Sequence, residues 1–208
     1  MGFHKKTIRD VPIDNHTVLV RVNYDIPVNN SGEISDDLWI RSSLPTIEYL
    51  LNRDCKVIVV SHHGKPVGCD AKYSLEPAAA RLARLLRRDI RFVSEVVGDR
   101  VLQAIKKSPG KSVIVLENLR FYPGEDANDS DFARKLVHST GARYFVQDGF
   151  GVAGNRSATT DVITDFVPSV AGLALEQDYL TILKVVDLTG AKNRLDLPGV
   201  EVLLDVGR

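Results

Sequence analysis

Residues 56–66 read KVIVVSHHGKP, a run of Val and Ile that ends in two histidines, a glycine and a lysine. A short run rich in β-branched residues, bounded by a glycine-bearing loop, predicts a buried strand. Glycine, lysine and histidine together are typical of loops that hold anions. The stretch therefore predicts a buried strand that opens into an anion-binding loop.

The same pattern recurs along the chain and decides the fold class. Strands are predicted at 17–22, 56–60, 90–93, 112–117 and 143–148, and helices at 42–53, 75–88, 98–107, 130–140 and 169–186. Ser74 is the expected N-cap of the second helix, and Gly141 the residue that ends the fourth. Apolar strands that alternate with helices predict an α/β fold of three layers, α/β/α, with a mainly parallel sheet.

Composition narrows the class of protein. The chain has 208 residues, 44% of them hydrophobic, and carries 27 basic and 27 acidic side chains. A net charge of zero argues against nucleic-acid binding, and no apolar run approaches the ~20 residues that span a membrane. Cys55 and Cys69 have no metal-ligand spacing and indicate a reduced environment. We therefore expect a cytoplasmic protein without a metal or cofactor.

Polar segments follow four of the predicted strands, at 21–25, 61–66, 117–125 and 147–151, and the last three of them contain glycine. Parallel sheets bind ligands at the carboxyl ends of their strands. We therefore expect these four segments to meet at one edge of the sheet and to form a site for a small anionic ligand.

The first of these segments carries Arg21, Asn23 and Asp25, spaced by two. If the strand continues through them, their side chains share one face. A guanidinium, an amide and a carboxylate in a row could bind a hydroxy acid. The alternative is a local ion pair between Arg21 and Asp25 at the strand end.

The remaining segments offer one candidate each. His62 is either a structural histidine or, with Gly64 and Lys65 nearby, part of an anion site. Arg120 has a guanidinium suited to phosphate or carboxylate, or it forms a salt bridge to an acidic neighbour, Glu117 or Glu125. Asp148, followed by glycine, could be a metal ligand, but a turn-forming role is favoured.

Seven motifs, in order, resemble the N-terminal lobe of phosphoglycerate kinases. They are RVNYDIPV (21–28), ISDDLWIRSSLPTI (34–47), SHHGKPVG (61–68), YSLEPAAARLARLL (73–86), LENLRFYPGE (116–125), DGFGVA (148–153) and PSVAGLALEQ (168–177). The resemblance runs from about Thr17 to about Leu183. It implies a Rossmann-like lobe that binds 3-phosphoglycerate in a basic patch, while a second lobe binds the magnesium nucleotide.

The resemblance also makes the second lobe an open question. The helix at 169–186 resembles the family's interlobe helix, and the segment 197–205 resembles the terminal segment that returns to the N-lobe. The residues 189–192 could instead resemble the first glycine-rich turn of the nucleotide lobe. We expect a single domain, with an N-lobe at 1–186, a segment at 187–208 that packs back on it, and no nucleotide lobe.

Several positions depart from the family's substrate patch. Acid and amide have changed places at Asn23 and Asp25, Trp39 replaces an arginine, and Lys65 replaces another. Trp39 removes a permanent charge and a guanidinium fork, and Lys65 keeps the charge but loses the bidentate geometry.

A second group of departures follows the DGFG motif. Gly154, Asn155 and Ser157 stand where the family has His, Arg and a further His. Arg156 lies one residue from the lost arginine and could substitute for it in part. His62 and Arg120 match the family.

Three functions are compatible with this pattern. The first is a truncated, degenerate homologue that is inactive alone, weakly binds a phosphorylated or carboxylic acid, or acts as a regulatory module. The second is the substrate-binding half of a split kinase that needs a separate nucleotide lobe. The third is an interaction module in which an exposed Trp39 docks a protein partner.

Overall fold

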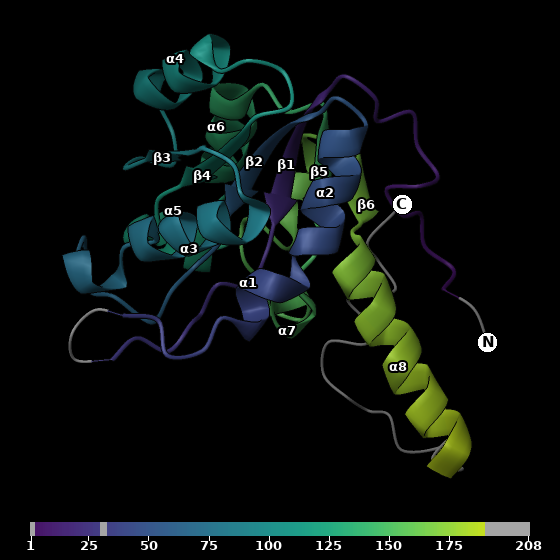
Figure 1. Ribbon diagram of the computed structural model, residues 1–208. Helices are drawn as coiled ribbons and strands as arrows, with labels where there is room; N and C mark the ends of the chain where they lie inside the picture. Colours follow the sequence, from purple (N-terminus) through teal and green to yellow (C-terminus); the bar gives the residue numbers. More distant parts are fainter. Residues whose placement is uncertain (1–2, 30–32, 190–208) are drawn as a thin grey trace.

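The computed structural model describes residues 3–29 and 33–189, and in this part of the chain a six-stranded sheet forms the middle layer (Figure 1). The strands are β1 (Thr17–Arg21), β2 (Lys56–Val60), β3 (Ile90–Val93), β4 (Val113–Leu116), β5 (Tyr144–Gln147) and β6 (Ser169–Ala171). Their order is β3-β4-β2-β1-β5-β6, and all five pairings are parallel. In register, Val18 lies beside Val57 of β2 and Tyr144 of β5.

Helices cover both faces of the sheet, which confirms the predicted α/β/α class. They are α1 (Leu38–Ser42), α2 (Leu44–Asn52), α3 (Glu76–Leu86), α4 (Asp99–Lys107), α5 (Pro123–Asp126), α6 (Ser130–Thr140), α7 (Phe150–Ala153) and α8 (Leu173–Thr189). Short 3₁₀ helices span Ala71–Tyr73, Leu119–Phe121 and Val162–Asp165. No described helix is long and apolar enough to cross a membrane.

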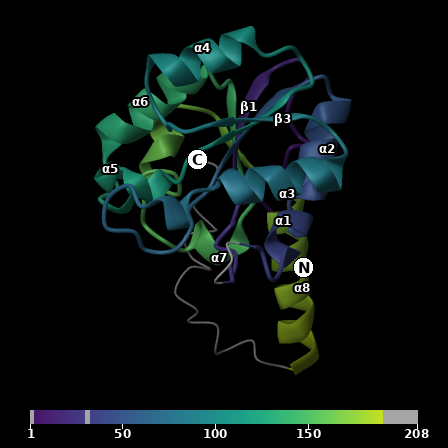
Figure 2. The ribbon, with the colours of Figure 1, turned by 60° about the vertical axis from the view of Figure 1, so that its left-hand side comes forward.

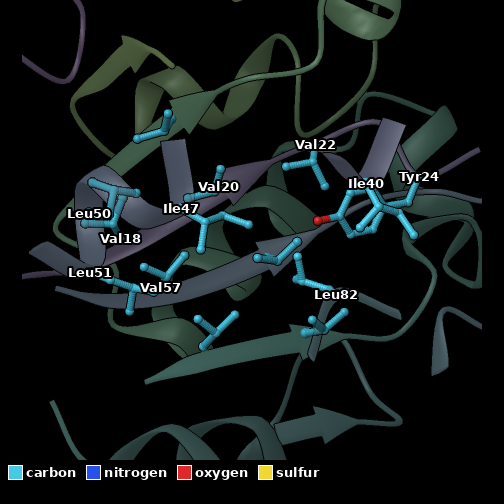
Figure 3. Packing of buried hydrophobic residues seen from close by; sticks show 14 of the residues in the cluster. Val18, Val20, Val22, Tyr24, Ile40, Ile47, Leu50, Leu51, Val57 and Leu82 are labelled. Carbon is cyan, nitrogen blue, oxygen red and sulfur yellow. The ribbon is translucent and has the colours of Figure 1, made fainter. Parts of the chain in front are cut away.

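The core has two halves because successive strand residues point to opposite faces. Val18 and Val20 of β1 pack with Ile47 and Leu50 of α2, as Figure 3 shows. Leu19, between them, belongs to a second cluster on the other face. The second cluster takes Val101 and Ile105 from α4 and Phe132 and Leu136 from α6. A strand buried on both faces is apolar on both, as residues 18–20 of β1 and 57–60 of β2 are.

Capping explains where two helices begin and end. Asp129 accepts backbone hydrogen bonds from Asp131 at 2.7 Å and Phe132 at 3.1 Å, which fixes the start of α6. Gly141 ends α6 in the left-handed region at φ 61°, as predicted. The N-cap residue of α3 is Leu75 rather than Ser74, although the Ser74 hydroxyl accepts from the Glu76 amide at 3.2 Å.

Two predicted helices differ from the structure. The helix expected at 42–53 is α2, which begins only at Leu44 and has Pro45 in its first turn, and the separate helix α1 that precedes it was not predicted. The helix expected at 169–186 begins only at Leu173, because residues 169–171 form β6 at the sheet edge. Helix α8 continues to Thr189, and the predicted return segment from residue 190 onward lies outside the described residues.

Candidate anion site

The four polar segments meet at the carboxyl edge of the sheet, as predicted. The hydroxyl of Ser61 accepts from the Tyr24 amide at 2.7 Å and donates to the Val22 carbonyl at 2.9 Å, which ties the first segment to the second. The side-chain amide of Asn118 donates to the His63 carbonyl at 2.8 Å, which ties the third segment to the second. The backbone amide of Asp148 donates to the Arg21 carbonyl at 2.9 Å and adds the fourth.

A pocket of about 350 Å³ opens at this edge, between the segment after β4 and the segment after α7. It brings together four predicted site residues: Arg21, Arg120, Asn155 and Arg156. Its other lining residues are Glu125, Asp126, Val152, Gly154 and Ser157. Three guanidinium groups therefore converge on one cavity, together with two carboxylates.

Arg21 forms the buried floor of the pocket. Its guanidinium donates to Thr159 Oγ1 at 2.9 Å, to the Val22 carbonyl at 2.5 Å and to His62 Nδ1 at 3.1 Å. Burial lowers the pKa of Arg21 to about 10, which leaves the side chain charged at neutral pH. Arg21 thus places a fixed positive charge at the floor of the pocket, while most of its N–H groups donate to other protein atoms.

The predicted pairing of Arg21 with Asp25 is wrong, because the acid that faces Arg21 is Glu125. Glu125 Oε1 lies 3.9 Å from the Arg21 guanidinium and is buried with it. The same oxygen accepts from Ser157 Oγ at 2.9 Å and Thr159 Oγ1 at 2.6 Å. Sequence reasoning considered Glu125 only as a partner of Arg120, so its organising role was missed.

Arg120 bridges two of the loops at the rim. Its Nη1 donates to the Gly64 carbonyl at 2.7 Å, and its Nε donates to Asp126 Oδ1 at 3.1 Å. The acid is therefore Asp126, and neither Glu117 nor Glu125 takes the role expected for it. Within the described residues Nη2 of Arg120 has no hydrogen bond, so one donor group remains for a ligand.

The segment after α7 supplies the opposite wall. Arg156 is exposed and donates from Nε to Asp161 Oδ2 at 2.9 Å. Asn155 is also exposed, and its carbonyl accepts a hydrogen bond from the Thr160 hydroxyl. An exposed Arg156 can turn toward a ligand at the cost of one surface ion pair, typically less than about 1 kcal/mol.

His62 is buried beside the pocket floor and is neutral. Burial, followed by the charges of Arg21 and Arg120, lowers the pKa of His62 to about 2. An arginine can only donate, so Nδ1 accepts from Arg21 and the ring proton resides on Nε2. Nε2 lies 3.9 Å from Asp25 Oδ2, on the side of the loops. His62 therefore offers an N–H donor rather than a charge.

Five predicted site residues do not line this pocket: His62, described above, and Asn23, Asp25, Trp39 and Lys65. Strand β1 ends at Arg21, so Asn23 and Asp25 do not continue its face. Asp25 instead accepts from the Gly64 amide at 2.7 Å. Lys65 is exposed, and Trp39 is 40% exposed on α1.

Asp148 is neither a metal ligand nor a turn-former, which corrects both readings of it. It is buried, and its Oδ1 accepts from Thr46 Oγ1 at 2.7 Å and from the Ala174 amide at 3.0 Å. It thereby anchors the first turn of α8. Burial raises the pKa of Asp148 to about 7. No group of His, Cys, Asp and Glu able to hold a metal ion occurs among residues 3–29 and 33–189.

Comparison with known proteins places the chain in a family. The family model for phosphoglycerate kinase matches residues 8–193. The phosphoglycerate kinases of Desulforudis audaxviator and Aquifex aeolicus are 45% and 42% identical over 175 residues, which is 84% of this chain and 44% of each relative. The chain thus spans a little under half the length of these relatives.

Solved structures give the same result. The phosphoglycerate kinase of Pyrococcus horikoshii matches with a TM-score of 0.78 and 27% identity, over 86% of this chain and 45% of that one. The enzyme of Coxiella burnetii matches with a TM-score of 0.74 and 25% identity, over 93% and 46%. The protein described here belongs to the phosphoglycerate kinase family.

Proposed function

We propose that this domain binds a small phosphorylated or carboxylic acid of the 3-phosphoglycerate type in the pocket lined by Arg21, Arg120 and Arg156. The observation that carries the proposal is the convergence of three guanidinium groups on one cavity at the carboxyl edge of a parallel sheet. Ligands of α/β sheets bind at that edge. Guanidinium groups match phosphate and carboxylate oxygens in a planar, two-pronged geometry.

The balance of charge in the pocket favours weak binding. Glu125 and Asp126 lie in the same lining and offset two of the three arginines. Arg120 already donates to Asp126, and Arg156 to Asp161. A ligand must therefore compete with two carboxylates for its donors. Lys65 follows Gly64, whose carbonyl accepts from Arg120, and it has no hydrogen bond or ion pair in the described structure, so it is a further cation near the pocket that has no partner to lose.

We further propose that residues 3–189 alone do not transfer a phosphoryl group. Phosphoryl transfer depends on positioning donor and acceptor and on stabilising the charge that moves between them. The family resemblance assigns the nucleotide to a second lobe, and it places Trp39 and Asn155 where the family has arginines. Loss of an arginine that stabilises a transition state typically costs a factor of about 10³ or more.

Isothermal titration calorimetry with 3-phosphoglycerate tests the binding proposal. We expect saturable heat in the millimolar range, competition by inorganic sulfate, and a loss of about tenfold or more in Arg120→Ala. Arg134→Ala is the matched control, because Arg134 is exposed on α6 and pairs only with Asp131 at 2.8 Å. Absence of heat at millimolar ligand, or equal loss in both variants, would refute the proposal.

A second candidate function is the acid-binding half of a complete kinase whose nucleotide lobe lies outside residues 3–189. The outer part of α8 favours it. That helix starts beside β6 and extends away from the sheet (Figure 1), and Val185 on it is 55% exposed. Leu180, Ile182 and Leu183 are only partly buried. Mixing this domain with the nucleotide lobe of the Desulforudis audaxviator relative should then restore turnover, and Val185→Asp should weaken that restoration.

A further inference from the structure

The end of α3, the turn after it and the start of β3 carry five arginines and no lysine in eleven residues. They are Arg81, Arg84, Arg87, Arg88 and Arg91. Helix α3 lies toward the viewer in Figure 2. Because α3 ends where β3 begins, this cluster lies at the amino edge of the sheet. The pocket described above lies at the carboxyl edge, so the proposed acid site does not use these arginines.

Two of the five arginines have structural partners. Arg81 pairs with Asp37 at 2.5 Å and so ties α3 to the start of α1. Arg91 donates to the Ala104 carbonyl at 3.0 Å, near the end of α4. The fold therefore explains the positions of Arg81 and Arg91.

The other three arginines are exposed and unpaired. Within the part of the chain that the structure describes, the side chains of Arg84, Arg87 and Arg88 have no hydrogen bond and no ion pair. Together with Ala83 and Asp89 they line a wide, open hollow of about 580 Å³. Asp89 is its one acidic residue, so the hollow carries a net charge of about +2 in a chain of zero net charge.

The backbone at Arg87 adds an independent observation. Arg87 ends α3 in the left-handed region at φ 52°, where its amide donates to the Ala83 carbonyl. Helix α6 ends in the same conformation with Gly141, at φ 61°. A residue with a Cβ costs about 1 kcal/mol more than glycine in this conformation. At the end of α3 the chain thus has Arg87 in a strained conformation, and this residue adds a third guanidinium to the hollow.

The helix dipole alone does not account for three unpaired arginines. Cations at a helix C-terminus are stabilising by roughly 0.3–1 kcal/mol, and the effect is confined to the last turn. Helix α6 has one basic residue there, His138. In α3, Arg84 already occupies the last turn. The helix dipole therefore accounts for Arg84 but not for the additional charges of Arg87 and Arg88.

We propose that Arg84, Arg87 and Arg88 form a docking site for an acidic, extended segment of a partner protein, rich in Asp or Glu. Guanidinium groups bind carboxylates in a bidentate manner that lysine cannot reproduce. Nucleic acid fits less well, because its binding commonly engages roughly six to ten phosphates and its bases stack on aromatic side chains. No exposed large aromatic lines the hollow, and a membrane surface would need apolar anchors that it also lacks.

Fluorescence anisotropy with a fluorescein-labelled peptide of alternating Glu and Asp tests the site. We expect saturable binding that weakens with added salt and falls by about tenfold or more in the triple variant Arg84→Ala, Arg87→Gly, Arg88→Ala. The matched control, Arg134→Ala with Lys135→Ala on α6, should bind like the parent chain. Arg87→Gly alone should weaken binding while raising the unfolding temperature, since glycine relieves the left-handed strain.

Three results would overturn the proposal. One is the absence of saturable binding at low salt, and another is equal loss in the triple variant and the α6 control. The third is tighter binding of an oligouridine RNA than of the peptide, which would assign the hollow to nucleic acid instead. The acid site is tested separately through Arg120, so either proposal can fail while the other holds.

Discussion

The guanidinium of Arg21 donates from Nη2 to Nδ1 of His62 over 3.1 Å. This bond links the end of β1 to the loop after β2, and it determines the tautomer of the ring, because an arginine cannot accept. A protonated His62 would place two cations in contact inside the protein. Burial, together with the charge of Arg21, therefore holds His62 in the neutral form, and the N–H at Nε2 is the remaining polar group of the ring.

The neutral state of His62 predicts a loss of stability in mild acid. The pKa of His62 is about 2 in the folded chain and about 6.5 in an unfolded one. Between these values the unfolded state binds the extra proton, so the contribution of His62 is complete above pH 6.5 and falls as the pH decreases. From pH 7 to pH 5 the free energy of unfolding should fall by about 2 kcal/mol through His62. Urea denaturation of the parent chain and His62→Gln at the two pH values measures it.

In His62→Gln this contribution should disappear, since an amide oxygen can accept from Arg21 without titrating. His16→Gln is the control, because His16 is a histidine that does not contact Arg21. If His62→Gln keeps the full acid dependence of the parent chain, the neutral ring is not its source.

For Asp148 we expect the opposite dependence of the free energy of unfolding on pH. Its pKa is about 7 in the folded chain, against 3.8 for an ordinary aspartate. Between these values the folded state holds a proton that the unfolded state has released, so stability falls as the pH rises toward 7 and is then constant. Asp148→Asn cannot ionise and should reduce the loss between pH 5 and pH 8 by about 3 kcal/mol.

The measurement is again urea denaturation, followed by circular dichroism at pH 5 and pH 8. An asparagine can still accept at Oδ1 from Thr46 and from the amide of Ala174, so α8 should remain attached. Asp165→Asn is the surface control. If Asp148→Asn and the parent chain show the same difference in free energy of unfolding between pH 5 and pH 8, ionisation of this carboxyl does not destabilise the fold.

The sequence predicts what depends on local pattern and on topology. The Val and Ile run at 56–60 is β2 to the residue, and Arg120 lies at the carboxyl edge, as parallel strands require. What it does not predict are partners far apart along the chain. Asp148 has its acceptor role because Thr46, 102 residues away, packs beside it. Strand β6 is only three residues long and runs directly into an apolar helix, so periodicity could not separate the two.

Glu125 predicts a large structural penalty on truncation. Glu125→Ala removes the acceptor of the Ser157 and Thr159 hydroxyls and leaves the charge of Arg21 buried without a counter-charge. Breaking a buried pair in this way costs about 3–5 kcal/mol. Glu125→Gln keeps an acceptor at Oε1 and should cost less. Thermal unfolding of both variants decides the matter, and a penalty below about 1 kcal/mol for Glu125→Ala would contradict the role assigned to it.

Asp126 predicts a gain of affinity rather than a loss. Its carboxylate accepts a hydrogen bond from Nε of Arg120 and adds a negative charge to the lining of the pocket. Asp126→Asn removes that charge from an exposed position, so the affinity for 3-phosphoglycerate should rise by about three- to tenfold at low salt, with a smaller rise at high salt. Calorimetry measures the change, and Asp131→Asn on α6 is the matched control for loss of a surface carboxylate beside an arginine. Equal affinities in the parent chain and Asp126→Asn would mean that a ligand does not compete with Asp126 for Arg120, and the anion would then have to bind through Lys65 and Arg156 instead.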